Sequence, residues 1–528
     1  MTAASGQTVA VIGLGAMGLA TVKNLLEEGF QVTGFERSAY VGGLWHYTKD
    51  PETLSVLEST VVNVSIDRGC YTDFPFPKDT PAHCSAREVQ DYLESYADHF
   101  NLRPHLRLNT DVKRIWRSDE HAKWQLELAG AASEYFDKVV VATGPHQLPM
   151  MPQFEGEELF TGRLMHSRAF KTADAFTGKR VVIVGLGNTG GDIADDLIGH
   201  ASSISISHNR GAVIMPRERG GVPATNPLSY RFLIIISILD WLLPRLAEVL
   251  FNRKAAQVMQ GAFGDPDPAW NLRPFPSVRV TNPIISDTLI PNLRSGAIRS
   301  VPGIKRFTGP DELELENGDV IQADAVICCT GYKNDFRLVD PRYDPAADPS
   351  PAWLNAAGSH DRPLPRLYQN VFSLKAPDSL AYVGCAWFVS GAFCLADIVS
   401  MCIAQVWAGK SSLPDHTEME RWVQRQEKRI CALAQRGTVI PASVPPRQWL
   451  VWADKTAGMG VEEHLGWGWK GWVFWWRDRQ LWRMAMNGVL AASIWRLFEG
   501  KRKAWDGARD EVLRVNTVQA KGRLGKDL

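Results

Sequence analysis

Two glycine-rich loops carry the clearest chemistry in this chain. The first places Gly13, Gly15 and Gly18 in a G-x-G-x-x-G pattern, and Glu36 follows 18 residues after the last glycine. In such a loop the first glycine makes a tight turn, the second lets the backbone approach a pyrophosphate, and the third lets the next helix pack closely on its strand. An acid at the end of the following strand hydrogen-bonds free ribose hydroxyls. The pattern predicts a site for a dinucleotide with a free ribose, such as FAD or NAD.

The second loop repeats the pattern with Gly185, Gly187 and Gly190, but its next strand is followed by a cation, Arg210, and no acid. A carboxylate at this corner would repel a 2′-phosphate, whereas an arginine pairs with one. The second site is therefore predicted to bind NADP. The alternative for Arg210 is a solvated surface arginine.

The elements that must position these loops follow from the hydrophobic pattern. Residues 8–13 are a short apolar, β-branched run typical of a buried parallel strand. Residues 31–35, 180–184 and 203–207 are predicted to be further strands, and a helical segment follows each glycine loop. Residues 138–144 and 325–331 are further strand-like runs that end in Thr-Gly, where the chain of a two-dinucleotide flavoprotein crosses between its domains.

We therefore expect an α/β fold with two Rossmann-like dinucleotide-binding domains. Residues 1–150 and 325–415 form a discontinuous FAD-binding domain, and residues 151–324 form an inserted NADP-binding domain with a helical insert at about 220–265. The apolar run 232–251 in that insert is predicted to form one or two helices, as a cap over the substrate site or a membrane-facing surface. Residues 416–528 form a Trp-rich, helical C-terminal extension.

Composition and charge exclude several classes of protein. The 528 residues hold 58 Lys and Arg against 58 Asp and Glu, so no global basic field attracts nucleic acid. The hydrophobic and charged fractions, 45% and 22%, are those of a globular protein and exclude a disordered chain.

The eight cysteines form no C-x-x-C pair, which argues against a zinc ribbon and against a disulfide reductase, and no metal site is expected. We find no signal peptide and predict no spanning helix, because the longest uncharged stretch, 379–396, is interrupted by glycines and is expected to be a buried strand turning into a helix. We expect an intracellular, cytoplasmic protein, with peripheral membrane contact as an open alternative.

That alternative comes from tryptophan. Eight of the 19 Trp residues lie between 467 and 505, interleaved with arginines. Two interpretations remain open: helices packed on the core, or a monotopic segment at a membrane interface through residues 461–505.

Together the motifs resemble those of the class B flavin-dependent monooxygenases, and within them the flavin-containing (dimethylaniline-type) monooxygenases. The resemblance covers roughly residues 8–410, and the stretch 70–77 is similar to fungal members that tailor natural products. Besides the two glycine loops, it rests on Gly42-Gly43-Leu44-Trp45, Asn63 ten residues before Asp73-Phe74-Pro75-Phe76-Pro77, the Phe160–Phe170 fingerprint with His166, and Cys329-Thr330-Gly331-Tyr332.

The resemblance implies roles for individual residues. Those implied to bind FAD are Gly13, Gly15, Gly18, Glu36, Gly43, Leu44, Trp45, Asn63 and Val64. Those implied to bind NADPH are Gly185, Gly187, Asn188, Thr189, Gly190, Gly191, Asp192 and Arg210. The resemblance implies that His166 couples the two domains and the nicotinamide rather than acting in acid–base chemistry. A structural hydrogen-bonding role is the alternative for this histidine.

The resemblance also implies the reaction. NADPH reduces the flavin, O2 adds to it, and the flavin C4a-(hydro)peroxide inserts one oxygen into a small lipophilic metabolite by N- or S-oxygenation, hydroxylation or epoxidation. Asn63 is the implied catalytic residue, as the hydrogen-bond partner of the peroxide. Baeyer–Villiger oxidation of a ketone is the alternative, although Phe170-Lys171 at the end of the fingerprint favours the flavin-containing branch. An NADPH oxidase or redox sensor is a third hypothesis. The substrate and oligomeric state stay open.

Overall fold

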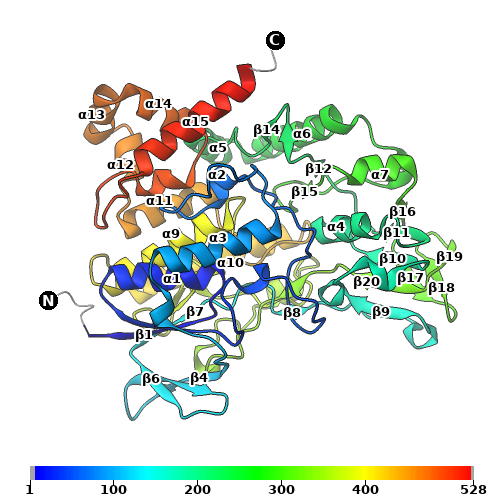
Figure 1. The fold of residues 1–528 in the computed structure, drawn as a ribbon, viewed down its shortest axis with the longest axis horizontal. Coiled ribbons are helices and arrows are strands. Elements are labelled where there is room, and N and C mark those ends of the chain that lie inside the picture. The colour runs from blue at the N-terminus through cyan, green and yellow to red at the C-terminus, as the bar shows by residue number, and fades with distance from the viewer. Residues whose placement is uncertain (1–5, 525–528) are drawn as a thin grey trace.

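Two sheets, one mixed and one parallel, lie side by side in the computed structural model, which describes residues 6–524 with side chains to residue 517 (Figure 1). The first sheet has the order β22-β23-β24-β7-β1-β2-β3. Its strands are β1 (Thr8–Ile12), β2 (Gln31–Phe35), β3 (Leu106–Arg107), β7 (Lys138–Val141), β22 (Leu367–Tyr368), β23 (Phe372–Ser373) and β24 (Leu380–Tyr382).

The second sheet is parallel throughout and has the order β16-β11-β10-β20-β9. Its strands are β9 (Arg163–His166), β10 (Arg180–Val184), β11 (Ser203–Ser207), β16 (Arg299–Val301) and β20 (Ala325–Cys328). Because β20 pairs with β9 and β10, the chain returns to the first sheet only beyond Cys328, slightly later than the boundary at 325 expected from the sequence.

Shorter strands form separate small sheets. Two antiparallel meanders are β4 (Val112–Ser118), β5 (Lys123–Leu128) and β6 (Glu134–Phe136), and β17 (Ile304–Phe307), β18 (Glu312–Leu315) and β19 (Val320–Gln322). Two-stranded pairs are β8 (Leu148–Pro149) with β21 (Tyr332–Lys333), β12 (Ile214–Met215) with β15 (Ile284–Ile285), and β13 (Glu218–Arg219) with β14 (Val222–Pro223).

The helices cover the sheets and extend beyond them. Those up to residue 407 are α1 (Ala16–Glu27), α2 (Ile66–Gly69), α3 (Ala86–His99), α4 (Asn188–Leu197), α5 (Tyr230–Leu242), α6 (Pro244–Phe263), α7 (Leu289–Ser295), α8 (Pro351–Leu354) and α9 (Ala392–Trp407). The C-terminal ones are α10 (His416–Ala434), α11 (Pro446–Ala457), α12 (Val461–Leu465), α13 (Trp469–Arg477), α14 (Arg479–Asn487) and α15 (Ala508–Leu524).

The strands and helices around both glycine loops are those predicted from the sequence. The run 379–396 holds β24 and the start of α9, as expected, and the apolar run 232–251 forms two helices, α5 and α6. Within residues 6–524, no helix combines the length and the apolar character that crossing a bilayer requires. All eight cysteines are free thiols.

A buried network of charges fastens the C-terminal extension to α1. Arg496 is 4% exposed, and its Nη2 lies 2.7 Å from Asp73 Oδ2 while its Nε donates to Thr72 Oγ1 at 3.0 Å. Lys23 on α1 pairs with the same Asp73, and Asp397 on α9 accepts a 2.9 Å hydrogen bond from the Thr72 N–H. Burial opposes ionisation of Asp397, but Arg496 and Lys23 nevertheless hold its pKa below the ordinary value.

The Trp-rich segment is divided between the two interpretations that the sequence left open. Trp495 is 3% exposed and packs in the main hydrophobic core, as the first interpretation requires. In contrast, Trp467, Trp469, Trp472 and Trp476, on and just before α13, are more than half exposed.

Candidate functional site

The first glycine loop has the close backbone packing that its spacing predicted. Gly13 has φ +94°, in the left-handed region that favours glycine, and a Cβ there would lie 2.8 Å from the Ala142 carbonyl oxygen. A Cβ on Gly18 would collide with the Gly13 carbonyl oxygen, so α1 can start close behind β1 only with glycine at this position. A Cβ on Gly15, the N-cap of α1, would lie 3.6 Å from the Gly43 Cα.

Glu36 lies at the end of β2 with its carboxylate held by the backbone. Its Oε2 accepts the Leu14 N–H and its Oε1 accepts the Ser38 N–H, both at 3.0 Å. The carboxylate is thus fixed beside the glycine loop, and a carboxylate has further lone pairs to accept ribose hydroxyls.

The remaining residues expected near the flavin lie on two loops. Gly43, Leu44 and Trp45 form a short 3-10 turn, and the Trp45 ring meets Phe393 of α9 edge to face at 6.0 Å. Asn63 and Val64 are half-buried just before α2. The Asn63 Oδ1 atom is buried and has no hydrogen-bond partner among the described residues.

The orphaned Asn63 oxygen provides a test of cofactor fit. An unpaired buried polar atom costs about 1–3 kcal/mol, and a bound group with an N–H or O–H would relieve that cost. A narrow glycine loop, a fixed ribose-binding carboxylate and an unpaired amide together fit a flavin dinucleotide.

The second glycine loop resembles the first but leaves more open space. Gly185 has φ +107°, and a Cβ there would lie 2.8 Å from the Cys329 carbonyl oxygen. A Cβ on Gly190 would collide with the Gly185 carbonyl oxygen, whereas a Cβ on Gly187 would meet no described atom within 4 Å. Space in front of Gly187 is what a pyrophosphate approaching the N-terminus of α4 needs.

The other residues expected in the NADP region lie on α4 but differ in their surroundings. The Asn188 side chain is already engaged within the protein, since its Oδ1 accepts the Ile285 N–H at 2.9 Å. This hydrogen bond joins β15 to α4. Thr189 is exposed and Gly191 is buried. Burial raises the pKa of Asp192 to about 6 against the opposing charge of Arg217, and neighbouring Asp195 and Asp196 add to the rise.

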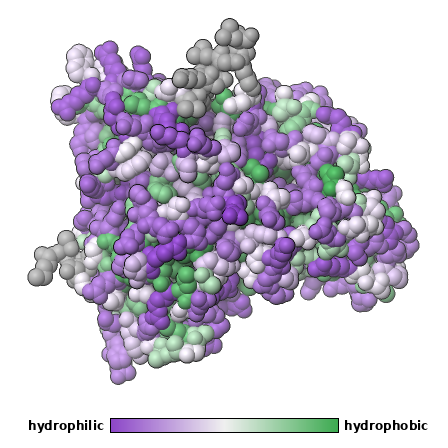
Figure 2. Space-filling model, viewed as in Figure 1, coloured by the Kyte–Doolittle hydropathy of each residue, from purple (hydrophilic) through white to green (hydrophobic). Residues whose placement is uncertain are grey.

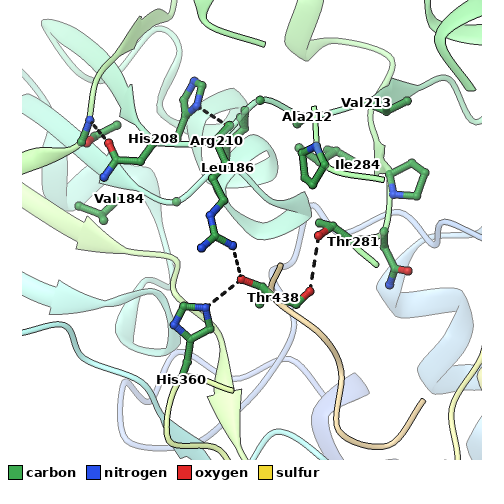
Figure 3. A pocket seen from close by; sticks show the side chains of 18 of the residues that line it. Val184, Leu186, His208, Arg210, Ala212, Val213, Thr281, Ile284, His360 and Thr438 are labelled. Atoms are coloured by element: carbon green, nitrogen blue, oxygen red, sulfur yellow. Dashed lines mark hydrogen bonds between the residues drawn. The ribbon is translucent and has the colours of Figure 1, made fainter. Parts of the chain in front are cut away.

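A cavity of about 540 Å³ opens at the carboxyl ends of β10 and β11 (Figure 3). This volume lies within the range of small-molecule and cofactor sites. Its lining includes Gly185, Leu186, His208, Asn209 and Arg210, so the cavity begins at the second glycine loop and ends at the predicted phosphate-binding arginine.

Arg210 is joined in this cavity by two residues that the sequence did not point to. Its Nη1 donates to the Thr438 Oγ1 at 2.7 Å, and the His360 Nε2 lies 2.8 Å from the same oxygen (Figure 3). Burial lowers the pKa of His360, and the charges of Arg362 and Arg210 lower it further. Thr438 comes from the loop after α10, so the C-terminal extension forms one wall of the cavity.

His166 contacts the segment between the sheets. Its Nε2 lies 3.0 Å from the Gly331 carbonyl oxygen, and its Nδ1 accepts the Arg168 N–H at 3.1 Å. Burial lowers the pKa of His166, which favours the neutral ring with a proton on Nε2. This arrangement agrees with a structural hydrogen-bonding group at the junction.

The fold and the two loops define a class: a flavoprotein with two dinucleotide-binding domains, one for FAD and one for NADPH. The sequence profile of the family described as "FMO-like: Flavin-binding monooxygenase-like" matches residues 6–514. The chain therefore belongs to the flavin-binding monooxygenase-like family, and it is an FAD-dependent NADPH monooxygenase.

Relatives of known name support this assignment. The chain is 40% identical over 514 residues to "Monooxygenase aurF" of Gibberella zeae, covering 96% of this chain and 97% of that protein. It is 30% identical over 436 residues to "Flavin-containing monooxygenase 2" of Homo sapiens, covering 80% of this chain and 77% of that protein.

Solved structures share the fold. S-allyl-L-cysteine S-oxygenase from Allium sativum superposes with a TM-score of 0.60 at 22% identity, covering 85% of this chain and 88% of that one. Cyclohexanone monooxygenase with bound ε-caprolactone superposes with a TM-score of 0.62 at 16% identity, covering 85% and 98%. At these identities the likeness extends to the fold alone.

Proposed function

We propose that this enzyme uses NADPH and O2 to place one oxygen atom on a small lipophilic metabolite, at a nitrogen or sulfur atom or at carbon by hydroxylation or epoxidation. The observation that carries the proposal is the unpaired, buried Asn63 amide oxygen, in a chain that also has the complete glycine loop expected to bind FAD. The stretch 70–77, which is similar to fungal members that tailor natural products, supports a metabolite substrate, and the chain is 40% identical to a monooxygenase of Gibberella zeae over nearly its whole length.

The bound flavin supplies redox and oxygen-transfer chemistry, and the protein orients its partners. Gly13, Gly15 and Gly18 hold the FAD pyrophosphate, and Glu36 holds its ribose. Asn63 and Val64 would contact the bound flavin, and the Asn63 amide would supply a hydrogen bond to the oxygen-transferring group. Gly43, Leu44 and Trp45 close the site and exclude water.

The helical insert is placed to influence the substrate. The Ser65 hydroxyl, two residues after Asn63, donates to the Asn226 Oδ1 at 2.8 Å, and the Arg68 Nη1 donates to the Thr225 carbonyl at 2.7 Å. Asn226 and Thr225 directly precede α5. We infer that the segment leading into α5 and α6 covers the substrate side of the Asn63 loop.

NADPH binds across the second loop. Gly185, Gly187 and Gly190 let its pyrophosphate reach the N-terminus of α4, and Arg210 pairs with the 2′-phosphate. The remaining residues expected in this region, Asn188, Thr189, Gly191 and Asp192, shape the start of α4. This arrangement selects NADPH over NADH, since NADH has no 2′-phosphate.

The test is to measure product and peroxide together. The purified yellow enzyme is given NADPH, O2 and panels of amines, thioethers, alkenes and ketones, and NADPH use, hydrogen peroxide and products are followed. Oxygenated amine, sulfide or alkene products support the proposal. Esters or lactones from ketones alone would replace it by a Baeyer–Villiger activity, and peroxide without product from any panel would indicate an oxidase.

Asn63→Asp tests the residue that carries the proposal. An added negative charge replaces the amide N–H donors at a half-buried position, so the variant is expected to retain FAD but to release a larger fraction of its NADPH-derived electrons as hydrogen peroxide. Equal coupling in the two proteins would refute the role of Asn63.

A further inference from the structure

Four tryptophans on and just before α13 are each more than half exposed among the described residues: Trp467, Trp469, Trp472 and Trp476. Trp467 is 87% exposed, Trp469 80%, and Trp476 73%. Tryptophan is normally largely buried, and each large aromatic side chain buries about 150–250 Å² when covered. A cluster of exposed rings of this size indicates a binding surface.

A second apolar ridge continues from the first. Trp241, at the end of α5, is 80% exposed, and six aliphatic neighbours are about half exposed: Ile235, Ile238, Leu242, Leu243, Val249 and Leu250. Helix α5 packs against α14, which in turn packs against α13. These helices lie along the upper edge in Figure 1, where Figure 2 shows apolar and polar surface interleaved. We call the exposed side chains of residues 230–263 and 467–487 the upper ridge.

The charges of the upper ridge are one-sided. It contains eight Lys and Arg against three Asp and Glu. Each acid is already neutralised, as Asp240 pairs with Arg279, Glu248 with Arg436 and Asp478 with Arg509. Among the described side chains, seven of the eight cations have no carboxylate partner: Arg231, Arg245, Arg253, Lys254, Arg477, Arg479 and Arg483.

We propose that the upper ridge docks the enzyme on an anionic lipid bilayer as a monotopic surface. Tryptophan rings and aliphatic side chains enter the headgroup and upper acyl region, and the unpaired cations meet anionic headgroups. Arg479 lies over the Trp475 ring at 4.2 Å, so its charge stays beside an aromatic ring at interface depth. Next to the upper ridge, α5 and α11 border an open pocket of about 430 Å³ with a mixed lining of Ile234, Ser237, Ile238, Arg447, Gln448 and Val451.

Charge favours lipid over a second copy of the chain. A twofold dimer brings the same surface patch of each subunit together. On the upper ridge that contact would place unpaired cations against unpaired cations, which costs free energy. An anionic bilayer supplies the opposite charge and a non-directional apolar phase. The proposal concerns location and does not depend on the reaction catalysed.

The experiment uses the full-length holoenzyme in flotation with vesicles of phosphatidylcholine, alone or with added phosphatidylserine. Wild type is expected to float with the anionic vesicles. Trp467→Ser/Trp469→Ser/Trp476→Ser is expected to lose most binding to both vesicle types. The matched control, Val320→Ser/Leu354→Ser, removes two similarly exposed side chains outside the ridge and is expected to float like wild type.

A charge variant tests the electrostatic part separately. Each cation near an anionic surface contributes about fivefold to binding, so Arg477→Gln/Arg483→Gln should bind phosphatidylserine vesicles about 25-fold more weakly. Bound flavin and sedimentation velocity are measured for every variant. The proposal would be overturned if wild type failed to float or if the matched control lost as much binding as the tryptophan variant. It would also be overturned if the ridge substitutions converted a dimer to a monomer without changing flotation.

Discussion

Arg210→Gln is expected to convert the enzyme from strong preference for NADPH toward indifference between NADPH and NADH. The guanidinium lies in the cavity at the end of β11, where its Nη1 is held at 2.7 Å by the Thr438 hydroxyl. Glutamine keeps a hydrogen-bonding group but is shorter than arginine and has no charge. The substitution therefore removes the expected ion pair with the 2′-phosphate, together with the hydrogen bond to Thr438.

The magnitude follows from the hydrogen bond that is lost. Hydrogen bonds to charged groups contribute about 1.5–3 kcal/mol. Arg210 is solvent-exposed, so solvent and salt screen the pair and favour the lower end of that range. A loss of about 1.5 kcal/mol weakens NADP⁺ binding about tenfold. NAD⁺ binding should stay constant, because NAD⁺ lacks the 2′-phosphate that Arg210 is expected to bind.

The assay is calorimetric titration of the oxidised holoenzyme with NADP⁺, NAD⁺, 2′,5′-ADP and 5′-AMP. Thr438→Val, which frees the guanidinium but keeps its charge, should weaken NADP⁺ binding less than Arg210→Gln. Arg299→Gln is the control, as Arg299 lies on β16 of the same sheet and does not line the cavity. Equal loss of NADP⁺ and NAD⁺ affinity in Arg210→Gln, or no loss, would refute the assignment of the phosphate site.

Three further predictions follow from single contacts. Gly187→Ala should fold with normal thermal stability but lose NADP⁺ affinity, whereas Gly190→Ala, whose methyl group would collide with backbone, should lower the melting temperature; the reverse order would contradict the proposed pyrophosphate site. The folded-state pKa of Asp192, about 6, lies above its ordinary 3.8, so the folded chain holds more protons between about pH 4 and 6 and the free energy of unfolding falls as pH rises through that window. Asp192→Asn should flatten this slope in chemical denaturation, and an unchanged slope would assign it to other groups. Arg496→Met should destabilise the fold by about 3–5 kcal/mol, because it leaves buried carboxylates without their cation; a smaller loss would mean that Lys23 alone compensates them.

Much of the fold could be predicted from local pattern. The buried strands β1, β2, β10 and β11 begin where the apolar runs begin, because β-branched residues and flanking glycines restrict the backbone locally. The short antiparallel strands β4–β6 and β17–β19 were not predicted, since their alternation is brief. Membership of β20 in the second sheet depends on hydrogen bonds to β9 and β10, which no local pattern encodes.

The candidate site also contains some residues that the sequence could identify and others that it could not. Glu36 and Arg210 could be found because each stands at a fixed place after a glycine loop and its strand. Thr438 and His360 could not, because they reach Arg210 from 228 and 150 residues away in the chain, and no spacing links them. A lone threonine in a loop after a helix has no sequence signal that distinguishes it from its neighbours.

By itself, the sequence determined two dinucleotide loops, the residue types at their ribose corners, and hence the class of enzyme. These are properties of a few adjacent residues and of backbone conformations that glycine alone tolerates. Tertiary structure decided which tryptophans are core and which are exposed, and that Thr438 of the C-terminal extension lines the cavity at the second glycine loop. Burial and long-range contact are set by the packing of distant segments, so residues as close as Trp476 and Trp495 have opposite surroundings.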